Sequence, residues 1–199
     1  MSKSKGIIVL ILLFFMVLAP LCANDIFSVG FGASLSYSQN TTGDEAPKFS
    51  KDNIAIGLEG RLNISYFQMD AVGEISVLDS DTLKLAGIIS VGGSVELFDV
   101  VKLGLTVGPR IAYLYSNASK SEDELEISNG KNLLEAIKDG PINIRLMLDV
   151  FAGPVMSIGF AYTIPTEFTI GQGNWESFAP SAQSFLKGQI SLSIQMKVF

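Results

Sequence analysis

The feature that most constrains the fold is an alternation of apolar with small or polar residues, which recurs eight times after residue 26. In the first run, the odd positions from Phe27 to Tyr37 are apolar, and the even positions between them are serine or glycine. Successive side chains of a β-strand point to opposite faces, so this alternation predicts strands with one apolar and one polar face. The predicted strands cover residues 27–37, 54–64, 67–77, 83–95, 101–115, 142–150, 156–164 and 186–198.

The eight strands predict a barrel. After the N-terminal leader, no apolar run reaches the ~18 residues that a membrane-spanning helix needs. Backbone groups in lipid must pair internally, and apart from a helix only a closed barrel achieves this. The polar face is rich in glycine, serine and alanine, which suits a narrow interior, so we expect the apolar face to meet lipid. The prediction is an all-β, eight-stranded antiparallel up-and-down transmembrane barrel over residues 24–199. A secreted, lipocalin-like soluble barrel is the alternative with the opposite faces.

Residues 1–23 are predicted to be a cleaved signal peptide. Lys3 and Lys5 precede an apolar run at 7–21, and Ala23 is a small residue at the expected cleavage site. Bulky Leu21 leaves an uncleaved anchor as the alternative and disfavours lipid attachment at Cys22. After cleavage the chain has neither cysteine nor histidine, so we expect no disulfide, no metal site and no cofactor.

The acidic balance of the chain excludes one class of partner. The formal net charge is −6, and without Lys3 and Lys5 it becomes about −8, because 12 basic residues then stand against 20 acidic ones. Such a charge argues against nucleic acid as a partner.

The connections alternate between tight turns and longer loops, as in spanning barrels. The predicted outer loops cover residues 39–52, 79–82, 116–141 and 165–184. Tyrosines collect at the predicted outer ends of the strands and phenylalanines at the inner ends, which predicts two interfacial girdles. Pro109 falls inside the fifth strand, where we expect a bulge or a missing hydrogen bond.

Charged residues on the polar face are the candidate lumenal site. The set is nearly balanced in sign, so we interpret it as a network of ion pairs that fills the barrel; a narrow polar conduit is the alternative. An acid–base role for Asp70 and Glu74 is less favoured than ion pairing, and we expect no enzymatic activity. The predicted network comprises Glu59, Arg61, Asp70, Glu74, Lys84, Glu96, Lys102, Arg110, Arg145, Asp149 and Lys187.

The outer loops carry the candidate contacts for a binding partner, since they project from a rigid scaffold. The loop at 116–141 contains an acidic cluster, which lacks the spacing of a calcium loop, and a segment at 131–139 with the apolar spacing of a short helix. The last outer loop contains aromatic residues that suit either a ligand or lipid headgroups. The candidate contacts are Glu122, Asp123, Glu124, Glu126, Trp175 and Phe178.

From residue 25 to the terminal Phe199, the chain resembles small outer-membrane barrels of the opacity, OmpX and OmpA-domain type, and more loosely OmpW. A C-terminal aromatic resembles the signal by which the barrel-assembly machinery recognises its clients, although Lys197 and Gln195 depart from the usual apolar pattern before it. The resemblance implies a bacterial outer-membrane location, with membrane lipid and the assembly machinery as partners.

Two functional classes follow from this resemblance. The first is a surface-exposed structural or adhesive protein with a filled lumen, which contacts a host or surface ligand through its loops. The second is an OmpW-like channel for small or hydrophobic molecules, for which inward Val72, Ile88 and Met147 give weak support.

Overall fold

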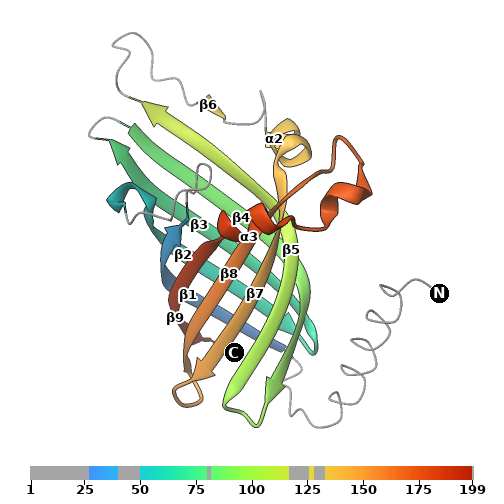
Figure 1. The fold of residues 1–199 in the computed structure, drawn as a ribbon. Coiled ribbons are helices and arrows are strands. Elements are labelled where there is room, and N and C mark those ends of the chain that lie inside the picture. Colours follow the sequence, from blue (N-terminus) through green and yellow to red (C-terminus); the bar gives the residue numbers. More distant parts are fainter. Residues whose placement is uncertain (1–26, 40–49, 80–81, 117–125, 128–132, 199) are drawn as a thin grey trace, which may run out of the picture.

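The structure is a closed antiparallel β-barrel (Figure 1). This computed structural model describes residues 27–39, 50–79, 82–116, 126–127 and 133–198, so the predicted leader lies outside the described residues. Eight long strands form the wall within the described ranges, and β1 pairs with both β2 and β9 to close it. The strands are β1 (Phe27–Ser38), β2 (Ile54–Ile64), β3 (Phe67–Asp79), β4 (Thr82–Leu97), β5 (Val101–Ser116), β7 (Pro141–Phe151), β8 (Met156–Thr169) and β9 (Gln189–Lys197).

The short elements all lie in the longer connections at one end of the barrel, and tight turns join the strands at the other end (Figure 1). The segment at 131–139 was predicted to be helical, and α2 lies within it. Among the described residues, no helix is long and apolar enough to cross a membrane. The short elements are η2 (Lys51–Asn53), β6 (Glu126–Ile127), α2 (Leu133–Asp139), η3 (Trp175–Phe178) and α3 (Ala182–Leu186).

The wall is apolar outside and polar inside, as the alternation predicts. Leu58 is 74% exposed on the outer face, whereas inward Thr106 and Ser36 are fully buried. Each large apolar side chain left in water forgoes roughly 1.5–3 kcal/mol of burial free energy, so a belt of such residues requires an apolar solvent. The lipocalin-like alternative needs the reverse arrangement and is wrong.

The rim of the barrel is uneven at the loop end. Pairs between β4 and β5 continue to Thr82 and Ser116, but β5 pairs with β7 only as far as Pro109 and Ile142. Beyond that point the two-residue β6 pairs with β5. The strands β3, β4 and β5 therefore rise above the wall made by β7, β8 and β9 (Figure 1).

Proline interrupts the pairing of β5 without changing its register. The pairs with β4 stop at Val107 and resume at Arg110 in the same register, so Gly108 and Pro109 have no β4 partner. A proline has no N–H to donate to a ladder. The prediction of a missing hydrogen bond at Pro109 fits this interruption.

Two strand boundaries differ from the sequence prediction. The strand expected to end at Ile164 continues to Thr169 as β8, past Pro165, and a register shift between Pro141 and Asn143 of β7 accommodates the irregularity. The strand expected from residue 186 begins instead at Gln189, because residues 182–186 form α3. Ser181 caps this helix, its hydroxyl accepting a hydrogen bond of 3.2 Å from the Ser184 N–H, and this local signal prevails over the alternation.

A tight turn with left-handed backbone generates the first prediction. Ser65, between β2 and β3, has a φ of 55°, a conformation that costs an L-residue roughly 1 kcal/mol but that glycine adopts freely. We expect S65G to raise the free energy of unfolding by about 1 kcal/mol, measured by urea titration of the refolded barrel in lipid vesicles. S65A keeps the Cβ atom and is the matched control; equal stabilisation by both variants would contradict this account.

Candidate functional site

Arg61 lies at the centre of the lumenal charge network. It comes from β2, and its guanidinium contacts carboxylates on two other strands and on its own. Nε donates to Asp70 of β3 at 2.7 Å, Nη2 donates to Glu59 at 2.9 Å, and Nη1 donates to Asp149 of β7. All four side chains are buried. Arg61 thus binds three carboxylates at once among buried side chains.

A second ion pair runs in the opposite direction across the lumen. Arg145 of β7 donates to Glu59 of β2 at 2.9 Å, so each of these two strands supplies one arginine and one carboxylate to the other. Three strands separate β2 from β7 in either direction around the barrel. The two pairs, Arg61–Asp149 and Arg145–Glu59, therefore span the full diameter; we call them the reciprocal ion pairs.

Glu74 is the centre of a second cluster of polar contacts, which lies closer to the loop end. Arg110 of β5 donates to its Oε2 at 3.1 Å, while Ser36 of β1 and Gln189 of β9 donate to Oε1 at 2.7 and 2.6 Å. Ser36 also donates to Ser191 at 3.0 Å. This carboxylate connects four strands, so the lumen is crossed at two levels.

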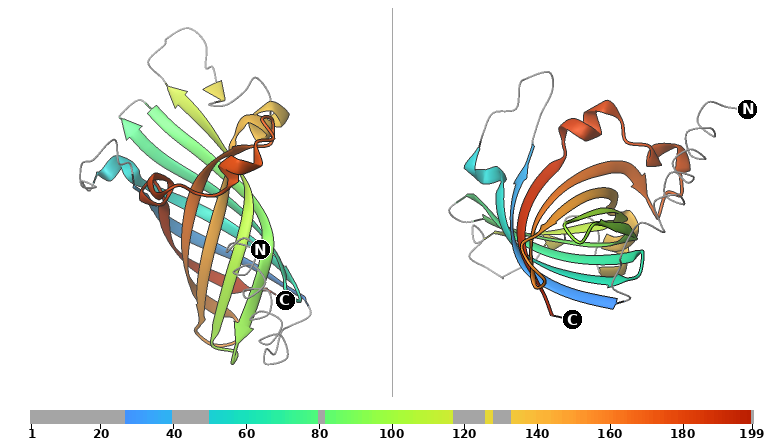
Figure 2. Two further views of the ribbon diagram at one scale, coloured as in Figure 1. Left: turned by 45° about the vertical axis from the view of Figure 1, so that its right-hand side comes forward. Right: turned by 90° about the horizontal axis from the view of Figure 1, so that it is seen from below.

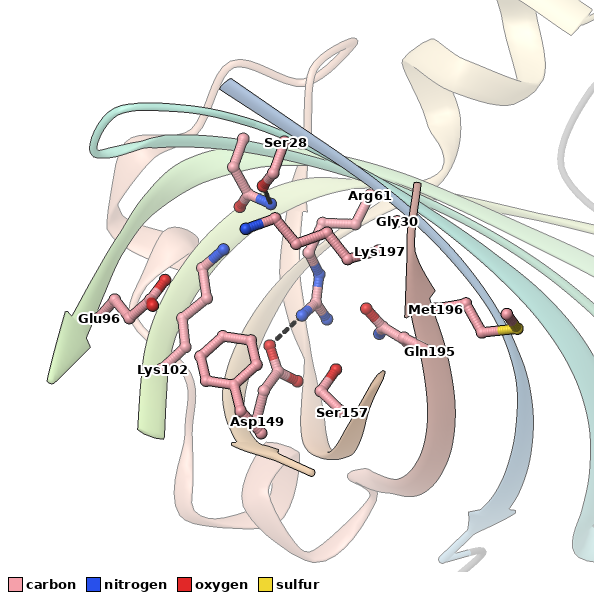
Figure 3. Close-up of a pocket in the computed structure, with 12 residues that line it drawn as sticks. Ser28, Gly30, Arg61, Glu96, Lys102, Asp149, Ser157, Gln195, Met196 and Lys197 are labelled. Carbon is pink, nitrogen blue, oxygen red and sulfur yellow. Dashed lines mark hydrogen bonds and ion pairs between the residues drawn. The ribbon is translucent and has the colours of Figure 1, made fainter. Parts of the chain in front are cut away.

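Two further predicted network residues, Lys102 and Glu96, lie next to the Arg61 cluster, because they line the same small pocket as Arg61 and Asp149. Lys102 is buried and Glu96 half-buried beside a pocket of about 40 Å³ at the tight-turn end (Figure 3). This volume suits a few water molecules and is far below the ~300 Å³ of a typical ligand pocket. Lys84 is half-buried near the loop end. The prediction for Lys187 is wrong, because this residue caps α3 and is exposed outside the strands.

Several uncharged partners of the network were missed by the sequence analysis. Gln68 donates to both oxygens of Asp70 at 3.0 and 2.9 Å, and it also approaches the Met147 sulfur at 3.3 Å. Ser36 and Gln189 bind Glu74. All three residues lie on the polar face by alternation, which was the available signal, but sequence spacing does not show which inward residues meet across a barrel.

Four of the residues predicted to contact a partner belong to the loop at 116–141. Glu122, Asp123 and Glu124 are outside the described residues, as is Phe199. Glu126 belongs to β6, whose backbone pairs with Leu114 of β5.

Trp175 and Phe178 belong to an aromatic cluster at the loop end. Both lie on η3 and contact Phe168 of β8, with ring centroids 4.9 and 5.8 Å from its centroid. Trp175 is 75% exposed, although its ring stacks on Phe168. It therefore offers a flat apolar surface outside the barrel.

Comparisons with known proteins bear on the fold. No protein-family model matches the chain, and no curated protein matches it. Among solved structures it is similar to Ail, the attachment invasion locus protein of Yersinia pestis, with 10% identity, a TM-score of 0.50, and 86% of this chain and 97% of that chain covered. The chain has the fold of a small outer-membrane β-barrel. The apolar outer belt fits this fold, because lipid is the solvent that such a surface requires.

Two further solved structures also align with this barrel. Ail in complex with the heparin analogue sucrose octasulfate has 13% identity and a TM-score of 0.48. Neisserial surface protein A (NspA) has 12% identity and a TM-score of 0.42. Each alignment covers 86% of this chain and 97% of the other chain.

The central position of Arg61 generates the second prediction. Removing one member of a buried ion pair leaves the other charge uncompensated, which costs roughly 3–5 kcal/mol. We expect R61M to lower the free energy of unfolding by this amount, measured by urea titration in lipid vesicles. The matched control is K138M, which removes an exposed charge from α2 and is expected to change stability by less than about 0.5 kcal/mol. Equal effects of the two substitutions would contradict a lumenal network centred on Arg61.

Proposed function

We propose that the protein is an exported, surface-exposed outer-membrane barrel with a structural or adhesive role and a lumen closed by its own side chains. The observation that carries this proposal is the reciprocal arrangement of the ion pairs between β2 and β7. A channel needs a continuous path along the barrel axis. Here two arginines and two carboxylates cross that axis and bind one another.

The balance of charge in the lumen also favours a plug over a conduit. Four carboxylates, Glu59, Asp70, Glu74 and Asp149, are buried and are matched by Arg61, Arg145, Lys102 and the half-buried Arg110. A balanced set neutralises itself and offers no excess charge to select a permeating ion.

The OmpW-like alternative requires an apolar path, which the inward apolar residues do not form. Met147 is buried, and its sulfur accepts hydrogen bonds from Arg61 at 3.5 Å and from Gln68 at 3.3 Å. Val72 and Ile88 are also buried, so they fill space among the polar side chains instead of lining an opening.

The geometry likewise gives no support for acid–base chemistry at Asp70 and Glu74. Asp70 is bound by Arg61 and Gln68, and Glu74 by Arg110, Ser36 and Gln189. Both carboxylates are buried, so a substrate has no approach to either one.

The adhesive part of the proposal depends on the loop end. Trp175 is exposed there, and tryptophan is among the residues enriched in the energetic centres of protein interfaces. A host or surface ligand would meet the connections that project at this end. Recognition of Phe199 by the barrel-assembly machinery and removal of residues 1–23 complete the proposal.

The closed lumen generates the third prediction. We expect the purified protein in planar bilayers to give no discrete current steps. We also expect replacement of the reciprocal ion pairs by serine, in the quadruple variant E59S/R61S/R145S/D149S, to open a water path and produce such steps. The quadruple variant removes two charges of each sign, so net charge stays constant. Steps of comparable size from the unaltered protein would rule out the plug.

The orientation of the barrel generates the fourth prediction. Gln172 lies in the exposed connection at the loop end, and Asp99 lies in a tight turn at the opposite end. We expect Q172C to react with a membrane-impermeant maleimide on intact cells and D99C to react only after the outer membrane is permeabilised. The unaltered protein sets the background, because its one cysteine, Cys22, belongs to the leader that we propose is removed. The reverse labelling pattern would place the loops in the periplasm and refute a surface role.

A further inference from the structure

The connection between β8 and β9 ends on the outside of the barrel wall, where α3 precedes β9. Tyr162 of β8 pairs with Leu146 on one side and Ile190 on the other, and both neighbours are exposed members of the apolar belt. The Tyr162 hydroxyl donates a hydrogen bond to the backbone carbonyl of Phe185 in α3. Because Tyr162 points outward, this bond holds α3 on the outer side of the wall.

The same connection covers the upper part of β8. Ile164 is the next outward position after Tyr162, and it is only 2% exposed, although Phe160 below is 48% exposed. The segments α3 and η3 both contact β8. Figure 2 shows them beside the wall instead of over the mouth. This part of β8 is therefore covered by the connection instead of by lipid.

Gly188 fixes the position of α3 relative to Tyr162. A Cβ atom at residue 188 would collide with the Tyr162 ring and hydroxyl, so only glycine allows so close an approach. The Gly188 N–H also donates to the Phe185 carbonyl at 3.2 Å. These contacts hold the end of α3 at the level of the outer tyrosines.

The outward side of α3 is apolar and ends in a cation. Phe185 is 46% exposed and Leu186 is 56% exposed, while Ser184 of the same helix is buried. Lys187 follows directly and is exposed. Two apolar side chains next to an ammonium are the combination that suits the boundary between acyl chains and lipid phosphates, where lysine extends its charge toward the headgroups.

We propose that α3 is an interfacial anchor whose occupant is the outer leaflet of the surrounding membrane. Phe185 and Leu186 lie in the boundary between acyl chains and headgroups, and the Lys187 ammonium binds lipid phosphate groups. This surface of α3 continues the lipid-facing belt, because α3 is bonded to Tyr162, whose strand neighbours belong to that belt. This inference rests on the proposed outer-membrane location and adds a membrane role for a connection that projects from the barrel.

Tryptophan fluorescence tests the proposal, because Trp175 is the only tryptophan in the chain. In a W175F background, F185W places the probe on the apolar side of α3, Q172W in the exposed connection after β8, and L192W within the belt. Each variant of the full chain is refolded into vesicles of brominated phosphatidylcholine, which quenches tryptophan in contact with acyl chains. L186W replaces F185W if the latter does not fold.

We expect F185W to lose on the order of half of its emission, as L192W does, whereas Q172W is quenched mainly by aqueous acrylamide. Quenching of F185W by lipid that does not exceed that of Q172W overturns the interfacial anchor while leaving the barrel in the membrane. Absence of lipid quenching in all probes, including L192W, overturns the outer-membrane location itself. The two failures are therefore distinguishable.

Discussion

The pairing of β1 with β9 is the interaction on which the rest of the structure depends. In hydrocarbon no water satisfies a free N–H or carbonyl group, so an open sheet edge is excluded and the first strand must meet the last. Closure then fixes the width of the interior, and eight strands leave room for side chains and little more. The apolar outside and the small, polar inside both follow from this closure. Ser36 and Gly32 of β1, which lie opposite Ser191 and Gln195 of β9, illustrate how small residues let the closing strands meet.

Once the lumen is narrow, its charges have to find one another. A buried carboxylate without a partner is costly, and the chain avoids that cost by placing Arg61 and Glu59 on β2 against Asp149 and Arg145 on β7. These contacts link strands that share no backbone hydrogen bond. They therefore resist changes in the cross-section of the barrel that the β-ladders alone would permit. The charge network therefore stabilises the shape of the barrel, and the closed lumen that we propose follows from it.

The sequence predicted the parts of the fold that depend on the alternation of neighbours along a strand. The eight strands, their inward and outward faces, and the burial of Asp70, Glu74 and Arg145 all follow from a period of two. Alternation failed near residue 186, where Lys187 continued the pattern but Ser181 began a helix, and near Pro165, where β8 continued despite a proline. It also could not identify partners across the lumen. Arg61 and Asp149 are far apart in the chain, and which inward residues face each other depends on strand stagger and barrel closure.

The uneven rim has a consequence for encounters at the cell surface. Because β3, β4 and β5 rise on one side while α3 lies lower on the other, the molecule is close to cylindrical within the bilayer but has a front and a back above it. A large partner approaching over α3 meets a lower obstacle than one approaching over β3, β4 and β5. Rotation of the barrel about the membrane normal therefore changes what it presents to a neighbour, and contacts made through this end have a direction in the plane of the membrane.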